Sequence, residues 1–359
     1  MPFYSNAHID FVDYAKMRIL IFVMKKSIYI AIALFFSTLA AFSQKDPLVG
    51  FYMGKISNQT SYPFGQSPEL CLEVSRFGES YQLKLTARPL LRTDNYGSAS
   101  GLKAENGKIV LKNFSSLGLS GEITPEGALL KGKNRKGNET VADLKKTTIV
   151  SPTMGMSAPE GAIVLFDGKS KSEWQHIGGE PCSWKLEDGA MVSQPLMVDG
   201  KKKDGTIYTK KKFGAVKIHL EFKIPAEYVL GEARGNSGVH FGPYEVQIID
   251  SFGGEGNWWQ CGAIYRIHAP KSNASLEPEA WQTYDIEYTP AKFVNGRLVA
   301  HPEMTVYQNG IRVQNKEPVF HPTNITQKDK PHTPDLISIG LQDHSHPVSF
   351  RNIWVQPLD

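Results

Sequence analysis

From Lys45 to the C-terminus the chain is a succession of short runs in which apolar and polar residues alternate, separated by turns rich in Gly, Asn and Pro. A period of two is typical of half-buried β-strands, and the 3.6-residue period of an amphipathic helix does not stand out. The pattern therefore predicts an all-β protein. Over residues 44–150 the expected strands are Leu70–Val74, Tyr81–Leu85, Lys108–Lys112, Gly118–Ile123 and Ala128–Lys131. No catalytic residue types cluster there, which indicates a small accessory β domain.

A linker is predicted over residues 151–159, where Pro152, Gly155 and Pro159 interrupt the alternation. A second series of short strands follows over residues 160–359, and Asn309-Gly310 between two of them is a strong hairpin signal. The expected strands are Ala162–Phe166, Ser183–Leu186, Ala190–Ser193, Thr206–Thr209, Val216–Ile224, Gly238–Phe241, Tyr244–Asp250, Tyr284–Tyr288, Thr305–Gln308, Ile311–Gln314, Leu336–Leu341 and Val348–Gln356. Many short strands with turns between them predict a β-sandwich of the jelly-roll kind. One sheet of such a sandwich can curve into a groove, and grooves lined by polar and aromatic side chains suit carbohydrates.

The first 43 residues are expected to be an extension plus a secretory signal peptide. Met24-Lys25-Lys26 is a basic start, Ile28–Leu39 is a compact apolar run, and Ala41-Phe42-Ser43 supplies small residues at the cleavage positions. The apolar run is shorter than the ~20 residues that a membrane span needs. We therefore expect Met24 to be the true start, the mature protein to be periplasmic or secreted, and no stable membrane span after cleavage.

Charged and polar residues stand out in one otherwise apolar stretch, from Asn236 to Asp250. In its second half the period of two places Glu245, Gln247 and Ile249 on one face of a strand. A carboxylate and an amide side by side in an apolar run are costly unless they contact something polar. This stretch is the first candidate for a functional site.

Composition narrows the range of partners. The net charge of +4 is small and the lysines are scattered, so a nucleic-acid surface is not indicated. The three cysteines, Cys71, Cys182 and Cys261, are widely spaced, and their odd number leaves at least one thiol unpaired. They form no zinc or redox motif.

Motifs across the second domain resemble the 3-keto-disaccharide hydrolase domain family. They are Val164–Ser170 with Trp174, Trp184–Gly189, Asn236–Val239, Tyr244–Asp250, Gly262–Tyr265, Gly340–His344 and Phe350–Ile353. The resemblance implies a concanavalin A-like jelly roll shared with laminarinase-type glycosidases. It also implies an exported bacterial protein that hydrolyses glycosides already oxidised at C3. One departure is that many members carry Arg after the position of Phe241, whereas this chain has Gly242-Pro243.

The implied chemistry needs acid and base groups, because a ketone at C3 acidifies the C2 proton, whose removal lets the C1 leaving group depart before water adds. Glu245 is the first candidate for base or acid, with Gln247 beside it to bind substrate. Asp343 and His344, at the end of an apolar strand, form a second candidate acid/base pair. Arg351 is expected either to bind a sugar oxygen or to pair with Glu245 or Asp343.

Aromatic residues extend the predicted site, since aromatic faces stack on sugar rings. Trp258, Trp259 and Trp281 are the candidates for stacking, and His268 could reach the rim of the groove. His240 is expected to be a satisfied core histidine, and Asp250 to be structural. No metal motif or cofactor-binding motif occurs, so no cofactor is predicted, although scattered Asp and His ligands leave a divalent metal open.

Two other functions remain open at this point. A lectin-like module would bind carbohydrate without catalysis. A retaining glycosidase of the laminarinase type needs two carboxylates about 5–5.5 Å apart, and Gln247 stands where the second acid on that strand face would be. The strand therefore favours the 3-keto-glycoside reaction over the ordinary glycosidase.

Overall fold

The computed structural model describes residues 45–57, 69–90, 95–134, 136–231, 234–324, 330–332 and 336–358. The predicted signal peptide and the start at Met24 lie outside these residues. The described part is all-β and contains no helix, which confirms the predicted fold class. It follows that none of its segments is a helix long and apolar enough to cross a membrane.

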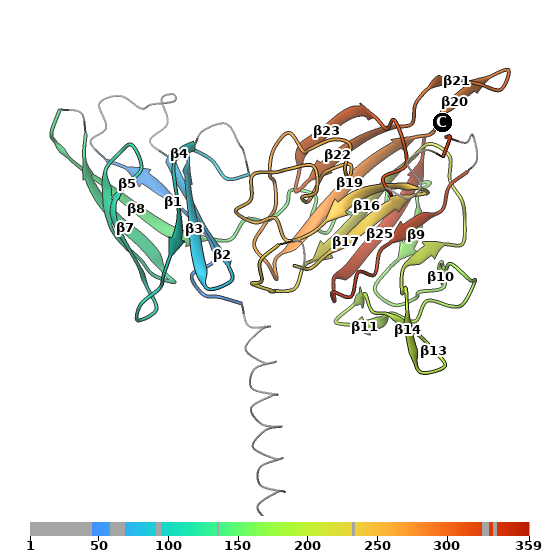
Figure 1. Ribbon diagram of the computed structural model, residues 1–359, viewed down its shortest axis with the longest axis horizontal. Helices are drawn as coiled ribbons and strands as arrows, with labels where there is room; N and C mark the ends of the chain where they lie inside the picture. The colour runs from blue at the N-terminus through green and yellow to red at the C-terminus, as the bar shows by residue number, and fades with distance from the viewer. Residues whose placement is uncertain are drawn as a thin grey trace, which may run out of the picture. The chain divides into compact units, whose positions relative to one another are not determined.

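The N-terminal strands form one antiparallel sheet in the order β4-β3-β2-β1-β8-β7-β6-β5 (Figure 1). Their bounds are β1 Gly50–Ile56, β2 Glu69–Phe77, β3 Ser80–Thr86, β4 Asn95–Leu102, β5 Ile109–Phe114, β6 Leu119–Ile123, β7 Gly127–Lys133 and β8 Glu139–Thr147. The sheet nearly closes on itself, since the Ser116 amide after β5 donates to the Tyr96 carbonyl in β4 at 3.4 Å. The expected strands omitted β1, β4 and β8. Strand β4 could not be recognised from its sequence, NYGSASGL, because it contains few apolar residues and so shows no alternation of apolar and polar positions.

Two further sheets form a sandwich over the second half of the chain. The smaller has the order β10-β15-β24-β17-β18 and the larger has the order β11-β12-β25-β16-β19-β22-β23, with β9 paired to β25. The smaller sheet contains β10 Trp174–His176, β15 Ile207–Thr209, β24 Ile339–Leu341, β17 Ser237–Phe241 and β18 Tyr244–Ile248. The larger contains β9 Ile163–Phe166, β11 Lys185–Glu187, β12 Ala190–Val192, β16 Val216–Lys223, β19 Trp281–Thr289, β22 Glu303–Gln308, β23 Ile311–Pro318 and β25 Ser349–Pro357.

The core lies between these two sheets, where alternate residues of each strand meet. Phe241 of β17 stacks on Tyr288 of β19 with ring centroids 5.2 Å apart, and Val246 of β18 is fully buried. The residues of β17 and β18 that alternate with these buried residues therefore point to the outer face of the smaller sheet. This alternation decides which side chains are available for a site.

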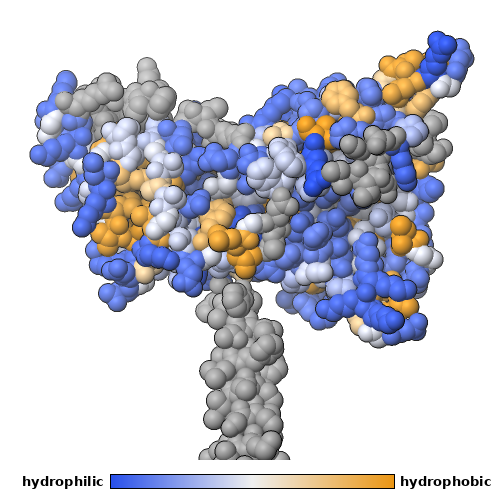
Figure 2. Space-filling view, viewed as in Figure 1, coloured by the Kyte–Doolittle hydropathy of each residue, from blue (hydrophilic) through white to orange (hydrophobic). Residues whose placement is uncertain are grey.

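Two hairpins pair only with themselves: β13 Leu196–Val198 with β14 Lys201–Lys203, and β20 Lys292–Val294 with β21 Arg297–Ala300. The second hairpin exposes Val294, Leu298 and Val299, and Figure 2 shows apolar surface on it. These side chains take no part in the core.

The N-terminal sheet and the sandwich touch through aromatic contacts. The ring of Phe51 packs edge-on against the ring of Phe252, with the ring centroids 5.1 Å apart. The Arg234 guanidinium lies 4.2 Å from the centre of the Phe77 ring. Lys45–Asp359 forms a single compact unit. The division at residues 150 and 160 stays a prediction.

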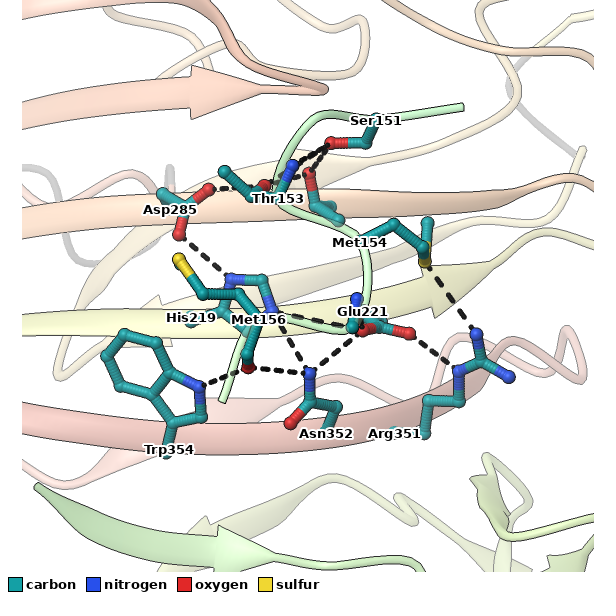
Figure 3. Close-up of polar contacts among 12 residues, drawn as sticks. Ser151, Thr153, Met154, Met156, His219, Glu221, Asp285, Arg351, Asn352 and Trp354 are labelled. Atoms are coloured by element: carbon teal, nitrogen blue, oxygen red, sulfur yellow. Dashed lines mark hydrogen bonds and ion pairs between the residues drawn. The ribbon is translucent and has the colours of Figure 1, made fainter. Parts of the chain in front are cut away.

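The segment expected to be a linker is bound along the outer face of the larger sheet (Figure 3). The Ser151 hydroxyl lies 2.6 Å from the Thr283 hydroxyl, and the Thr153 hydroxyl donates to Asp285 at 2.9 Å. Farther along, the Gly155 amide donates to Glu221 at 2.7 Å. This face is thus covered by the chain itself, whereas the outer face of the smaller sheet is open.

Candidate active site

A cavity of about 740 Å³ lies on the outer face of the smaller sheet. Each of four strands contributes a side chain that alternates with core residues: Gln175 of β10, Tyr208 of β15, His240 of β17 and Glu245 of β18. Alternation places these polar groups on one face, and the pairing of strands about 4.8 Å apart brings them together. The face that the sequence singled out at Glu245 is therefore the wall of a cavity.

Two glycines create the room for these side chains. A Cβ on Gly238 would lie 2.5 Å from Glu245 Oε1, and a Cβ on Gly340 would lie 2.8 Å from the Tyr208 ring and 3.2 Å from His240 Cβ. Both distances to the nearest atom are shorter than van der Waals contact. Glycine at 238 and 340 is what lets the Glu245, Tyr208 and His240 side chains lie flat over the sheet.

Glu245 is the residue of the cavity best suited to acid/base chemistry. Its side chain is nearly enclosed, with 7 % of the residue exposed, and no hydrogen bond from the described residues reaches its carboxyl. Burial raises the pKa of Glu245 to about 7, and the positive charge of Arg266 opposes that rise. A carboxyl with a pKa near neutrality can both take up and give back a proton at physiological pH.

A short segment beside β18 positions Arg266. The Tyr265 amide donates to the Glu245 carbonyl at 3.0 Å, and the Gln247 amide donates to the Ala263 carbonyl at 3.0 Å. Tyr265 and Arg266 consequently line the cavity next to Glu245. Tyr265 belongs to the sequence motif Gly262–Tyr265, but the sequence alone indicates no role for Tyr265 or Arg266.

His240 corrects one expectation. It is not a satisfied core histidine: it faces Glu245 across the β17–β18 pair, lines the cavity, and its buried Nε2 has no hydrogen-bond partner among the described residues. Burial lowers the pKa of His240 to about 4, so the ring is neutral at physiological pH. Gln342 also lines the cavity, and its buried Oε1 likewise lacks a partner in the described structure. The alternation of β17 could have shown that His240 points away from Val239 and Phe241.

The predicted pair Asp343 and His344 does not join Glu245 in this cavity. These residues line a separate shallow surface hollow with Lys202 and Lys203. Asp343 accepts hydrogen bonds from the Ser345 amide at 3.0 Å and the Gly205 amide at 3.2 Å, while His344 is exposed. Strand β24 ends at Leu341, so the turn sends Gln342 into the cavity and the next two residues away from it.

Arg351 pairs with neither Glu245 nor Asp343, because it lies on the larger sheet (Figure 3). Its Nε donates to Glu221 Oε2 at 2.6 Å, and its guanidinium lies 3.9 Å from the centre of the Trp281 ring. Burial alone would raise the pKa of Glu221, but the His219 ring 4.0 Å away and hydrogen bonds from Asn352, Arg351 and the Gly155 amide lower it to about 2. Arg351 and Trp281 therefore belong to the polar network under the bound linker segment, away from the cavity.

The remaining predicted substrate contacts lie around the cavity or beneath it. Gln247 is buried and does not line the cavity, and the Nε2 of His268 is 2.8 Å from the Pro318 carbonyl. Trp258 packs edge-on against Trp259 at 5.1 Å, and its ring lies 6.5 Å from that of Tyr265 in the cavity wall. With 45 % exposure, Trp258 is the predicted aromatic residue that comes nearest to the cavity with a free surface.

Asp250, expected to be structural, is buried 3.8 Å from the Arg234 guanidinium. Within the described ranges, no group of three or more His, Cys, Asp or Glu side chains is arranged to hold a metal ion. The three cysteines are buried free thiols.

Comparison with known proteins places these features in a family. The profile of the 3-keto-alpha-glucoside-1,2-lyase-like domain matches residues 161–356. A 3-keto-disaccharide hydrolase of Bacteroides thetaiotaomicron is 23 % identical over 273 residues, which cover 63 % of this chain and 90 % of that protein.

Solved structures of glycosyl hydrolase-like proteins from Parabacteroides distasonis are also similar. One is 36 % identical and covers 56 % of this chain and 86 % of that chain, with a TM-score of 0.49. Another is 21 % identical and covers 56 % of this chain and 95 % of that chain, with a TM-score of 0.41. The family match and the relative from Bacteroides thetaiotaomicron together indicate an enzyme of the glycoside hydrolase type acting on carbohydrate. The chain belongs to the 3-keto-alpha-glucoside-1,2-lyase-like domain family.

Proposed function

We propose that this protein cleaves glycosides whose sugar ring is oxidised at C3, with Glu245 moving the proton at C2. The observation that carries the proposal is the enclosed Glu245 carboxyl, with a pKa of about 7, in an open cavity of about 740 Å³. The family and the hydrolase from Bacteroides thetaiotaomicron support the choice of a 3-keto substrate.

The reaction proceeds in two stages. The ionised Glu245 takes the C2 proton, and the electron pair of that C–H bond is delocalised onto the C3 oxygen. The C1–O bond then breaks, a C1–C2 double bond forms, and the departing oxygen takes up the proton that Glu245 removed from C2. In the second stage water adds across the double bond, with its oxygen to C1 and a proton to C2. The sum of the two stages is hydrolysis, and Glu245 ends in the state in which it began.

The other polar groups of the cavity fit a sugar ring. The unpartnered His240 Nε2 and Gln342 Oε1 are buried sites that need a hydrogen-bond partner. Sugar hydroxyls can donate to an acceptor nitrogen or oxygen at both positions. An empty, buried polar atom costs free energy, and a bound hydroxyl removes that cost. We assign these two residues to substrate orientation.

A retaining glycosidase fits less well. That reaction uses two carboxylates about 5–5.5 Å apart, whereas Glu245 is the sole carboxylate among the described residues that line the cavity. A lectin would need no group with a perturbed pKa, so the raised pKa of Glu245 favours catalysis over binding alone.

The test compares a 3-keto-glucoside with its unoxidised parent as substrates. We expect release of the aglycone from the 3-keto compound alone, and a loss of at least about 10²-fold in kcat for Glu245→Gln, the range for removing a proton-transfer group. Glu187→Gln, on the exposed strand β11, is the matched control. Cleavage of the parent alone, or full turnover by Glu245→Gln, would refute the assignment. Retained glycan binding without turnover of either compound would favour the lectin.

We also propose that the enzyme acts outside the cytoplasm. The basic and apolar segment at residues 24–43 supports export. Fractionation of cells that express the full chain, followed by N-terminal sequencing, tests it: a mature N-terminus near Gln44 is expected, and an intact cytoplasmic chain would contradict it.

A further inference from the structure

Two cationic side chains line the cavity from separate parts of the smaller sheet. Lys212 lies just after β15, and Arg266 lies in the segment beside β18. In the sheet order β15-β24-β17-β18, β15 and β18 are three strand spacings apart, or about 14 Å. A cavity that extends across these strands has room for a ligand of more than one sugar ring.

Neither cation has a carboxylate partner. No ion pair within the described ranges involves Lys212 or Arg266, whereas Lys223 pairs with Glu279 and Lys271 with Glu317. The Arg266 guanidinium lies 5.3 Å from the centre of the Tyr265 ring. Both cations are solvent-exposed on the rim and are free to receive a ligand.

The rest of the cavity does not neutralise them. Among the described residues that line the cavity, Glu245 is the sole acid. It is partly protonated near neutral pH because burial raises its pKa to about 7. His240 is neutral there. The other acid whose charge reaches the cavity is Asp204, which acts on His240 and Tyr208 but does not line the cavity and accepts a hydrogen bond from the Thr206 amide at 2.9 Å. The cavity therefore carries a net positive charge.

The backbone holds Arg266 in an unusual conformation. Its φ is 61°, in the left-handed region that side chains other than glycine rarely adopt. The Arg266 amide donates to the Trp258 carbonyl at 3.0 Å, which fixes the turn. Strained residues of this kind are concentrated at functional sites. Here the strain places a guanidinium close enough to Glu245 for its charge to lower the carboxyl pKa.

We propose that the preferred substrate is an acidic 3-keto-glycoside, whose sugar carboxylate binds Arg266 on the ring that reacts at Glu245. The guanidinium matches a carboxylate in charge and shape, since two parallel N–H groups can donate to its two oxygens. Lys212, after β15, also lines the cavity and attracts the same class of ligand as a point charge. The inference rests on the proposed function and names the substrate class of that same site.

The experiment compares the 3-keto derivative of a glucuronide, its methyl ester and the corresponding 3-keto-glucoside. The ester keeps the shape and removes the charge. We expect kcat/KM for the free acid to exceed that for the ester by about tenfold, equivalent to ~1.4 kcal/mol. Added salt is expected to reduce this preference. Arg266→Gln should abolish it, and Lys185→Gln, an exposed lysine of β11, should retain it.

Equal turnover of the acid and the ester by the unaltered enzyme would overturn the inference while leaving the proposed function intact. So would an equal loss for acid, ester and glucoside in Arg266→Gln, because Arg266 would then serve the reaction itself and not the carboxylate. A binding arm separates the two proposals. Calorimetry on Glu245→Gln with methyl glucuronide and methyl glucoside should show tighter binding of the acid. If the variant prefers the acid and the unaltered enzyme turns over no 3-keto compound, the anionic site is sustained and the proposed reaction is refuted. If the variant shows no preference for the acid, the anionic site is refuted.

Discussion

Glu245→Gln should stabilise the protein at alkaline pH and have little effect on stability at acid pH. The Glu245 residue is 7 % exposed, and burial raises the pKa of its carboxyl from 4.5 to about 7. Because the folded state holds this proton more tightly than the unfolded chain does, its contribution to stability is fully present below pH 4.5. It is lost as the pH rises through about 7. Each tenfold change in proton affinity is ~1.36 kcal/mol, so the loss amounts to ~3 kcal/mol.

Glutamine has nearly the same shape and no charge, and it removes that penalty. No hydrogen bond of the described residues to the Glu245 carboxyl is lost in the exchange. The difference in free energy of unfolding between Glu245→Gln and the unaltered protein should therefore grow by ~3 kcal/mol from pH 4 to pH 8.

Urea denaturation of both proteins at several pH values measures this difference, and comparing the two cancels every titration that they share. Glu187→Gln, at an exposed position, is expected to show no change of this kind. A constant difference between Glu245→Gln and the unaltered protein across this range would mean that the carboxyl is solvated, and the assignment of a raised pKa would be wrong.

Further outcomes follow from the same contacts. Gly238→Ala places a Cβ 2.5 Å from Glu245 Oε1 and should lower kcat by about 10²-fold, because the carboxyl is displaced. Gly214→Ala is the control, since its Cβ would lie 3.5 Å from the nearest atom and should leave kcat unchanged. Equal kinetics for the two variants would contradict the packing argument. Arg351→Met leaves the buried Glu221 without its ion pair and should lower the free energy of unfolding, measured by urea denaturation, by ~3 kcal/mol. Adding Glu221→Gln should restore part of that loss, and kcat should stay unchanged. A drop in kcat at unaltered stability would instead place Arg351 in the active site. A rise of kcat/KM with pH to a plateau above about 7 is expected if Glu245 is the base, and a fall through the same range would make it the acid.

The sequence predicted the fold class because strand periodicity is a local property. In β16 and β18 every second residue is apolar and buried, so these strands could be recognised without their partners. Three residues are the least that can show a period of two, and the short strands β10, β13 and β20 were not expected, whereas the equally short β12 and β15 were. Glu245 could be singled out as a site candidate for the same local reason, as an uncompensated carboxyl in an apolar run.

What surrounds Glu245 was decided by the tertiary structure. Alternation assigns a residue to one of two faces but does not say what covers that face. The outer face of β16 is covered by residues 151–156, so His219 and Glu221 became members of a structural network with Arg351. The outer face of β17 is open, so His240 became a wall of the cavity.

The same limit applies at the ends of strands. Gln342, Asp343 and His344 are consecutive, and the turn after β24 sends the first into the cavity and the others to a separate surface. The sequence by itself thus determined an all-β chain with an acid/base candidate at position 245. The partners of that residue depended on cross-strand register, on two glycines that leave room above the sheet, and on which face the chain folds back to cover. Each of these brings together residues far apart in the sequence, and no local pattern encodes such a contact.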